Sequence, residues 1–201
     1  MTILGITGGI GSGKSYVARL LHVHWNIPVY DCDAAAKRLE EEDPSLRQAL
    51  IAAVGPEVYD GEIGHLVRPV LARYLFSSEA HASTVNAIVH PAVQRDFQRW
   101  AECQRDGLLA VESAILYESG FDSLVDLVLY VDAPLDVRIR RAMRRDGASL
   151  AQVEARIARQ DSEQGRSRAH YVIFNGEDAD EEELLRQMEE ALKDFLHPLA
   201  S

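Results

Sequence analysis

The sequence contains few cysteines and lacks any apolar run long enough to cross a membrane. Only Cys32 and Cys103 occur in 201 residues, too few for a disulfide framework or a four-ligand zinc site. No stretch approaches the roughly 18 consecutive apolar residues that a spanning helix requires. The chain opens directly into a short apolar segment without a basic region before it, unlike a secretory signal. We therefore expect a cytoplasmic protein with reduced thiols and no membrane partner.

Basic residues are also scarce. Lys and Arg number 21 against 32 Asp and Glu, so the formal net charge is −11. A chain this acidic is a poor general binder of nucleic acid, and we expect no nucleic-acid partner. The charge does not exclude a small anionic ligand, because a local pocket can oppose the net charge of the chain.

Apolar residues are plentiful enough for a core. They make up 47% of the chain, which argues against disorder and fits one α/β domain with insertions. Short apolar runs predict strands at residues 2–7, 29–31, 108–111, 127–131 and 171–174. Helical spacing predicts helices at residues 14–25, 34–41, 134–145 and 180–196. Strands separated by helices favour a parallel sheet flanked by helices.

The stretch from about residue 33 to residue 90 holds no convincing strand. Its pattern is mainly helical, with Ser45 as a candidate cap and with Pro69 and Pro91 as candidate first-turn residues. We therefore interpret it as an insertion beside the sheet and as a candidate substrate subdomain.

A glycine-rich phosphate-binding loop follows the first strand. Residues 8–15 have the pattern Gly-x-x-x-x-Gly-Lys-Ser. Gly11 and Gly13 allow backbone angles that turn successive N–H groups into one concavity at the start of a helix. Lys14 can then bind the β- and γ-phosphates of ATP, and the Ser15 hydroxyl can ligate Mg²⁺. The ATP-binding residues expected here are Gly8, Gly9, Gly11, Ser12, Gly13, Lys14, Ser15 and Tyr16.

The loop alone does not identify the class of nucleotide-binding protein. The sequence has no Asn-Lys-x-Asp segment of the kind that reads guanine, and it is short for most ATPase assemblies. A small-molecule kinase is favoured. Two alternatives stay open, which are a kinase for a nucleoside, nucleotide or sugar acid, and a nucleotide-dependent regulatory module without turnover. The regulatory module would need neither a catalytic base nor an arginine-rich lid.

Two aspartates follow the second strand. Asp31 and Asp33 flank Cys32, and the carboxyl ends of the strands in an open parallel sheet share one edge with the phosphate loop. Asp33 can accept a proton from a substrate hydroxyl there, or hold Mg²⁺ through water. Because a helix follows, Asp33 can equally be an N-cap.

Arginine is concentrated late in the chain. Residues 138–168 contain nine Arg against four acidic residues, a surplus of five positive charges. Such a run is often a solvated face, but phosphoryl transfer needs positive charge and the exclusion of water, which a closing helical lid supplies. Arg138, Arg141 and Arg145 share one helix face, and the spacing leaves open whether this stripe or the adjoining one faces ATP.

The chain resembles the dephospho-CoA kinase family over nearly its whole length. Residues 5–15 match the opening of the family almost letter for letter, and Asp33 falls on the second Asp of its Asp-x-Asp motif. Further matches follow in the family's order, at His90-Pro91, Leu116 to Ser119, Arg141, Arg145-Asp146, Arg156-Ile157 with Gln160, Val172-Ile173 and Asn175-Gly176. The chain departs from the usual family residues at Tyr16, Cys32, Ser113-Ala114, His170 and Phe174.

This resemblance implies that ATP, with Mg²⁺, phosphorylates the ribose 3′-hydroxyl of dephospho-CoA to give CoA and ADP, the last step of coenzyme A biosynthesis. It implies a single P-loop kinase domain of the nucleoside-monophosphate-kinase type. The expected parts are a core of residues 1–33, 91–134 and 169–201, a helical CoA-substrate subdomain of residues 34–90, and a lid of residues 135–168. We expect a monomer or a weak homo-oligomer.

The resemblance also assigns roles to residues. Asp33 is the implied base, and Lys14, Arg141 and Arg145 are the other implied catalytic residues. Arg141 and Asn175 are expected near ATP, and Asp33, His90 and Glu118 are expected near the acceptor substrate. His90 can also be a helix cap or a core histidine, and Glu118 has a similar structural alternative.

Overall fold

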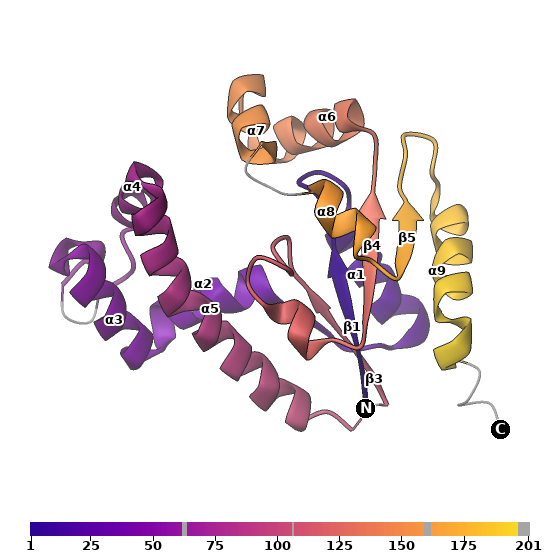
Figure 1. The fold of residues 1–201 in the computed structure, drawn as a ribbon, viewed down its shortest axis with the longest axis horizontal. Coiled ribbons are helices and arrows are strands. Elements are labelled where there is room, and N and C mark those ends of the chain that lie inside the picture. The colour runs from indigo at the N-terminus through magenta and orange to yellow at the C-terminus, as the bar shows by residue number, and fades with distance from the viewer. Residues whose placement is uncertain (62–63, 106, 159–161, 197–201) are drawn as a thin grey trace. The chain divides into compact units, whose positions relative to one another are not determined.

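The computed structural model describes residues 1–61, 64–105, 107–158 and 162–196 (Figure 1). It divides into two compact units. The sheet unit comprises residues Met1–Tyr30 and Asp106–Ser201, and the helical unit comprises residues Asp31–Arg105. Each unit is built around its own buried side chains.

A five-stranded sheet has the order β2-β3-β1-β4-β5. The strands are β1 (Thr2–Thr7), β2 (Val29–Asp31), β3 (Leu108–Glu112), β4 (Leu127–Asp132) and β5 (Tyr171–Phe174). β1 pairs in parallel with β3 and β4, and β4 pairs in parallel with β5. The predicted strands and the parallel α/β class are confirmed, and the central position belongs to β1, which leads into the glycine-rich loop.

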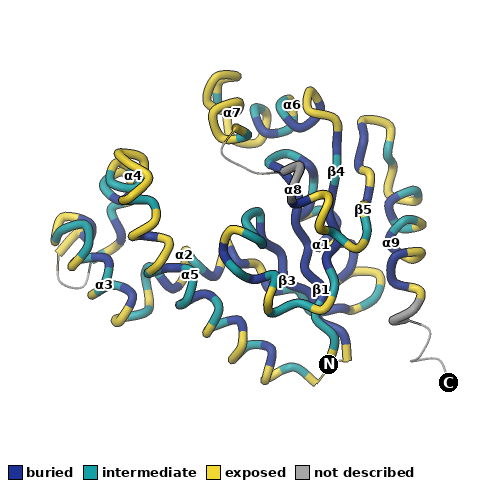
Figure 2. The backbone as a smooth tube through the Cα atoms, viewed as in Figure 1, coloured by how far each residue is buried: buried dark blue, intermediate teal, exposed yellow. Residues whose placement is uncertain are grey.

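Two helices bury their apolar faces against one side of this sheet. These are α1 (Lys14–Trp25) and α9 (Glu181–Leu196). Leu21 of α1 and Met188 of α9 join Leu4, Ile6 and Leu129 of the sheet in one core, in which all five side chains are fully buried (Figure 2). Each such side chain contributes roughly 1.5–3 kcal/mol through burial, which fixes the start of α1 against β1.

The other side of β1 is covered by the segment that follows β3. A Cβ added at Gly5 would lie 3.2 Å from Leu116 and 3.3 Å from Val125. The short 3₁₀ helix η2 (Phe121–Leu124) lies within this segment, and Phe121 is fully buried. A small residue at position 5 therefore lets this layer approach the central strand.

The predicted arginine-rich lid consists of three helices. They are α6 (Leu135–Asp146), α7 (Leu150–Ile157) and α8 (Ser162–Ser167). Ser149 and Gln152 form the capping box expected at the start of α7. Arg159 and Gln160, which belong to the same predicted lid, lie outside the described residues.

The helical unit contains four α-helices and the 3₁₀ helix η1 (Pro56–Val58) within its described residues. The α-helices are α2 (Cys32–Glu42), α3 (Pro44–Val54), α4 (Arg68–Ser77) and α5 (Glu79–Glu102). Pro69 lies in the first turn of α4, as predicted. The prediction of a cap at Ser45 is wrong, because the Asp43 side chain accepts from the backbone N–H groups of Ser45 and Leu46.

The prediction that Pro91 begins a helix is also wrong, since α5 continues through it. Pro91 removes one backbone hydrogen bond, at a cost of about 3 kcal/mol. Burial of Val85, Val89, Val93 and Phe97 along one face of α5 offsets this cost. The unit consequently extends from residue 31 to residue 105, beyond the predicted range of 34–90. Among the described helices, none has the length and apolar character of a membrane span.

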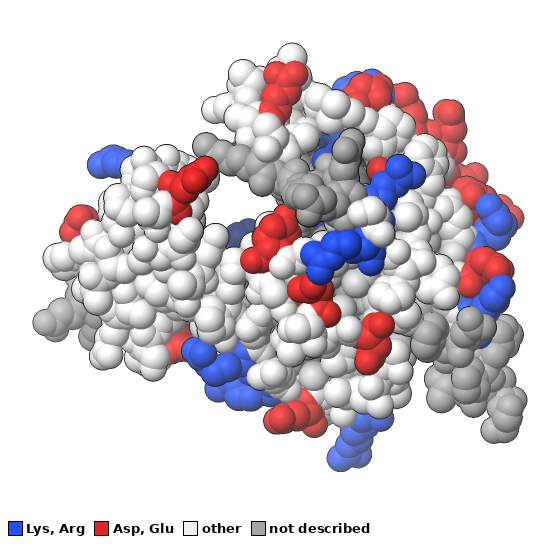
Figure 3. All heavy atoms as spheres, in the orientation of Figure 1, with Lys and Arg blue, Asp and Glu red and all other residues white. Residues whose placement is uncertain are grey.

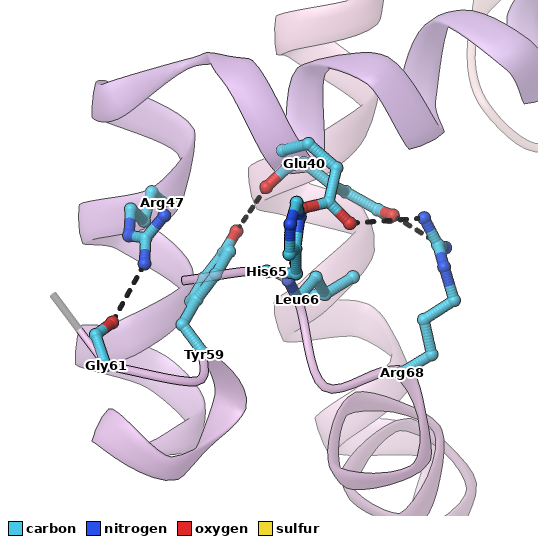
Figure 4. A network of polar contacts seen from close by, with 8 residues as sticks. Glu40, Arg47, Tyr59, Gly61, His65, Leu66 and Arg68 are labelled. Atoms are coloured by element: carbon cyan, nitrogen blue, oxygen red, sulfur yellow. Dashed lines mark hydrogen bonds and ion pairs between the residues drawn. The ribbon is translucent and has the colours of Figure 1, made fainter. Parts of the chain in front are cut away.

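A polar network ties the connection before α4 to α2 in the helical unit (Figure 4). The Glu40 carboxylate pairs with Arg68 at 3.2 Å, and the Tyr59 hydroxyl donates to the Glu40 carbonyl at 2.6 Å. Burial raises the pKa of Glu40, an effect that Arg68 partly offsets. Burial likewise raises the pKa of Tyr59 to about 12. Both groups are therefore structural partners with fixed protonation near neutral pH.

Candidate active site

The glycine-rich loop joins β1 to α1 through three glycines in conformations that other residues rarely adopt. Gly8, Gly11 and Gly13 have φ of 152°, 77° and 95°. Gly13 is the N-cap of α1, and an added Cβ there would lie 2.1 Å from the Asn175 side-chain nitrogen. These positions require glycine because of both backbone angle and close packing.

Polar groups of this loop are buried without protein partners. Lys14, the first residue of α1, is 9% exposed, and no carboxylate in the described part of the chain pairs with it. The hydroxyl of Ser12, which is 1% exposed, has no hydrogen-bond partner among the described residues. The positive end of the α1 dipole adds to the ammonium charge. These groups form a site whose chemistry suits phosphate oxygens.

Ser15 lies in hydrogen-bond contact with a carboxylate that the sequence analysis did not select. Its hydroxyl donates to Glu112 Oε1 at 2.7 Å. Glu112 is the last residue of β3, is 8% exposed, and aligns with Ile6 of β1. A carboxylate that ends an otherwise apolar strand beside the phosphate-loop strand was the available indication in the sequence. The pair brings together two oxygen ligands of the kind that Mg²⁺ prefers.

The described residues contain no cluster of three or more His, Cys, Asp or Glu side chains able to hold a metal ion. A complete protein cage is not required, since Mg²⁺ in nucleotide sites usually takes one or two protein ligands and completes its shell with phosphate and water oxygens. The donor set of Ser15 and Glu112 therefore fits Mg²⁺ bound together with a nucleotide.

The connection after β5 is fastened to the loop by Asn175 and Arg141. Asn175 is 5% exposed, and its side-chain nitrogen donates to the Ser12 carbonyl at 2.8 Å. Arg141 of α6 donates to the carbonyls of Asn175 and Gly176, each at 2.9 Å. The structure thus brings together Asn175, Arg141 and the loop, three elements that are far apart in the sequence.

A second arginine of α6 contacts the loop directly. Arg138 donates from Nε to the carbonyl of Ile10 at 3.1 Å and is only 7% exposed. Of the arginine stripe that the sequence predicted, Arg138 and Arg141 therefore reach the loop or its neighbour. Arg138 was not among the selected site residues.

Three other predicted residues of the sheet unit have different surroundings. Arg145 donates to its neighbour Asp146 at 2.7 Å, and this interaction holds the pKa of the Asp146 carboxyl below its usual value. The Tyr16 hydroxyl donates to the Glu181 carboxylate at 2.6 Å, and this hydrogen bond raises the pKa of the phenol. Glu118 is exposed in the turn after β3. The structure does not bring these side chains to the phosphate groups of the loop.

Asp33 and His90 belong to the helical unit. The N-cap of α2 is Asp31, which accepts from the Ala34 N–H at 2.9 Å. The alternative interpretation of Asp33 as the cap is therefore wrong, and its exposed carboxylate has no protein partner among the described residues. His90 lies within α5 and caps nothing, and burial lowers its pKa.

A cavity of about 410 Å³ lies between the start of α6 and the connection from β5 to α9. Asp136, Glu177, Asp178 and Glu183 contribute to its lining. Arg140 pairs with Asp136 at 2.7 Å and with Glu177 at 2.8 Å. A cavity with this many carboxylates disfavours phosphate groups, so the phosphate-binding chemistry belongs to the loop and not to this cavity.

A glycine-rich loop between a central parallel strand and a helix, with a buried lysine, a serine–carboxylate pair and arginines from a later helix, defines the P-loop kinases. The comparisons with known proteins narrow this class. A model of the dephospho-CoA kinase family matches residues 2–181. The chain belongs to the dephospho-CoA kinase family.

Relatives from several bacteria support this assignment. The chain is 47% identical over 176 residues to a dephospho-CoA kinase of Bacteroides fragilis, covering 86% of this chain and 83% of that one. It is 48% identical over 170 residues to one of Porphyromonas gingivalis, with coverage of 84% and 82%. The protein is accordingly a kinase.

Solved structures agree with the fold. The crystal structure of TT1252 from Thermus thermophilus matches with a TM-score of 0.83 at 37% identity and covers 96% of each chain. A shikimate kinase from Acinetobacter baumannii, at 16% identity and a TM-score of 0.57, covers 98% of this chain and 96% of its own. The second match shows the shared P-loop kinase fold alone.

Proposed function

We propose that this protein transfers the γ-phosphoryl group of ATP to the ribose 3′-hydroxyl of dephospho-CoA, giving CoA and ADP. The observation that carries the proposal is the phosphate site of Gly8 to Ser15, with its buried Lys14 and Ser12, in a chain of the dephospho-CoA kinase family. The acceptor oxygen forms a bond to the γ-phosphorus, the bond to the β-phosphate oxygen breaks, and the hydroxyl proton leaves to a base.

The loop and the lid supply positive charge to the transferring group. Lys14 and the loop amides bind the β- and γ-phosphates, which is where charge develops during transfer. Arg141 orders Asn175 against the loop, as its three hydrogen bonds to Asn175 and Gly176 support. Arg145 exchanges its Asp146 partner for phosphate oxygens when the lid closes over ATP.

Asp33 is the proposed base for the acceptor hydroxyl. Its carboxylate is exposed, follows β2 closely in the chain, and is not used to cap α2. A carboxylate with no structural hydrogen bond can accept a proton without destabilising the helix that carries it. The helical unit is the proposed binding region for the CoA moiety, with His90 there and Glu118 of the sheet unit as substrate-binding residues.

Magnesium is the proposed metal, held by Ser15 and Glu112, with Asp33 as a further ligand through water. The bound ion would neutralise charge between the β- and γ-phosphate oxygens. The protein's contribution is to orient Ser15, whose hydroxyl is held at 2.7 Å from the Glu112 carboxylate. Removal of that carboxylate should leave the loop formed but weaken the metal site.

Replacing Glu112 by Gln should make ATP binding less dependent on Mg²⁺. We expect the gain in ATP affinity that Mg²⁺ produces to fall about tenfold, while ATP affinity in EDTA changes little, because one charged hydrogen bond contributes roughly 1.5–3 kcal/mol. Calorimetry with and without Mg²⁺ measures both values. Asp122→Asn removes a carboxylate that pairs with Arg168 elsewhere in the sheet unit and serves as the control. An unchanged Mg²⁺ effect in Glu112→Gln would remove Glu112 from the metal site.

The remaining properties proposed are a cytoplasmic location, no nucleic-acid partner, and a monomer or weak homo-oligomer. On the face seen in Figure 3, acidic side chains intersperse with basic ones over α6 and α9, with no broad basic area on that face. This mixture supports small anionic substrates bound at a local site over a polyanion bound across a surface.

The direct test is ADP release from ATP and Mg²⁺ with dephospho-CoA, beside adenosine, AMP and gluconate as other acceptors. Release with dephospho-CoA alone, together with CoA as the product, is the expected result. Release only with one of the other acceptors would keep the kinase and reject the substrate. Rapid release without any acceptor would instead indicate an ATPase.

A further inference from the structure

Arg138 is a buried arginine placed against the first half of the phosphate loop. It lies in the first turns of α6, is 7% exposed, and donates from Nε to the Ile10 carbonyl at 3.1 Å. A Cβ added at Gly9 would lie 1.9 Å from Arg138 Nη2. The guanidinium therefore occupies the space that any larger residue at position 9 would fill.

The backbone of Arg138 packs just as closely on the loop. A Cβ added at Gly11 would lie 2.1 Å from the Arg138 carbonyl oxygen. Gly9 and Gly11 are thus needed for the approach of α6 as well as for the loop's own conformation. Since α6 is the first helix of the lid, Arg138 mechanically connects the lid to the loop.

The charge on Arg138 is not balanced by the protein around it. Its Nη2 atom is buried and has no hydrogen-bond partner among the described residues, and no carboxylate in that part of the chain forms an ion pair with it. Its contacts at the loop are the neutral backbone of Gly9, Ile10 and Gly11. Burying an unpaired cation is unfavourable unless an anion completes the site.

Other arginines of α6 differ in this respect. Arg140 is about half exposed and pairs with both Asp136 and Glu177. Arg145 is exposed and bonds to Asp146. Arg138 is the α6 arginine whose guanidinium is both buried and in contact with the phosphate loop, which is where a nucleotide would bring negative charge.

We propose that Arg138 is a positioning residue for ATP, which holds the Gly9–Ile10 half of the loop in place and contributes the positive charge that the nucleotide phosphates balance. The proposal, which rests on the proposed function only for the use of ATP, adds Arg138 to the residues that prepare the loop. Its effect should grow with the number of phosphates, because the interaction is electrostatic. ATP should depend on Arg138 more than ADP does, and AMP least.

Calorimetry with Mg²⁺-ATP, Mg²⁺-ADP and AMP on three variants tests this proposal. Arg138→Gln should weaken ATP binding about tenfold or more, as expected for loss of a charged donor. It should weaken ADP binding less and AMP binding least. Arg138→Lys keeps the charge and should stay within about threefold of the unchanged protein for ATP. The control Arg140→Gln removes an exposed, paired charge from the same helix and should change ATP binding by less than about twofold.

Kinetics with dephospho-CoA separate positioning from a general loss of structure. Arg138→Gln should raise KM for ATP by a similar factor while KM for dephospho-CoA stays near its original value. Equal losses for ATP, ADP and AMP, or ATP binding as tight as in the unchanged protein, would overturn the proposal. If Arg138→Gln does not fold, Arg138→Lys decides, because a tenfold loss of ATP affinity there would contradict the charge role. Binding of ATP needs no acceptor, so an error in the acceptor would leave these results intact.

Discussion

Replacing Lys14 by Ala is expected to reduce phosphoryl transfer by at least about 10²–10³-fold and to weaken ATP binding. Lys14 is the first residue of α1 and is almost fully buried at the glycine-rich loop. An ammonium group held at the loop interacts with the phosphates in a site of low dielectric, where loss of one preorganised donor has an effect of this size. Steady-state kinetics with dephospho-CoA and calorimetry with Mg²⁺-ATP measure the two effects.

Protein stability distinguishes this result from simple unfolding. Because no carboxylate in the described chain pairs with Lys14, the free protein gains no ion pair from it. Lys14→Met keeps the apolar stem, so its unfolding temperature without nucleotide should equal or exceed that of the unchanged protein. Lys193→Ala, which removes an exposed lysine paired with Glu190, is the control. Unchanged ATP affinity in Lys14→Met would reject the assignment of the loop as the phosphate site.

Replacing Asp33 by Asn should lower kcat by about 10²–10⁴-fold, the usual contribution of a general base. Affinity for ATP should stay within about twofold, because the change removes proton acceptance and not a phosphate contact. The shape of the side chain is kept. Asp33 does not cap α2, so the helix should be equally stable in the variant. Single-turnover measurements with saturating ATP isolate the chemical step from binding.

Asp31→Asn is the matched control for this prediction. Asp31 lies two residues away and caps α2 by accepting from the Ala34 N–H. Asn is about as good an N-cap as Asp, so this variant loses a neighbouring negative charge without losing the cap. A loss of kcat in Asp31→Asn as large as that in Asp33→Asn would mean that local charge, and not a base at Asp33, is responsible. Nearly full turnover in Asp33→Asn would remove Asp33 from the mechanism.

The sheet unit was predictable because its signals are local. The β-branched and apolar run of residues 2–7, the glycines that follow it, and the helical spacing of residues 14–25 all agree on one strand–loop–helix arrangement, which the structure confirms. The helix from Ser149 likewise follows from a capping box spanning four residues. Agreement between neighbouring signals is what makes such a segment readable from sequence.

The helical unit was less predictable where a local preference met tertiary packing. Proline usually marks a helix start, yet Pro91 lies inside the 24-residue helix α5. The buried face of α5 outweighs the one lost hydrogen bond, and no pattern near position 91 reports how much surface its neighbours will cover. Asp43 and Ser45 are both good caps, and the choice of Asp43 depended on where Pro44 begins α3.

The candidate site divides in the same way. The residues of the loop itself, Gly8 to Ser15, are contiguous, and their spacing alone indicates the phosphate-binding chemistry. The partner of Ser15 is Glu112, which lies 97 residues away. Neither that pairing nor the contact between Ile10 and Arg138, 128 residues apart, leaves a mark in the local pattern.

The sequence by itself determined the P-loop kinase class, the parallel α/β architecture and the family resemblance, because each depends on short segments whose residue types restrict the backbone directly. Only the tertiary structure decided which of the arginines in α6 reach the loop, that Asp31 caps α2 in place of Asp33, and that Glu112 meets Ser15. Those outcomes depend on how strands and helices distant in the chain pack together. Packing is set by the burial of many apolar side chains at once, and a local spacing rule contains no information about it.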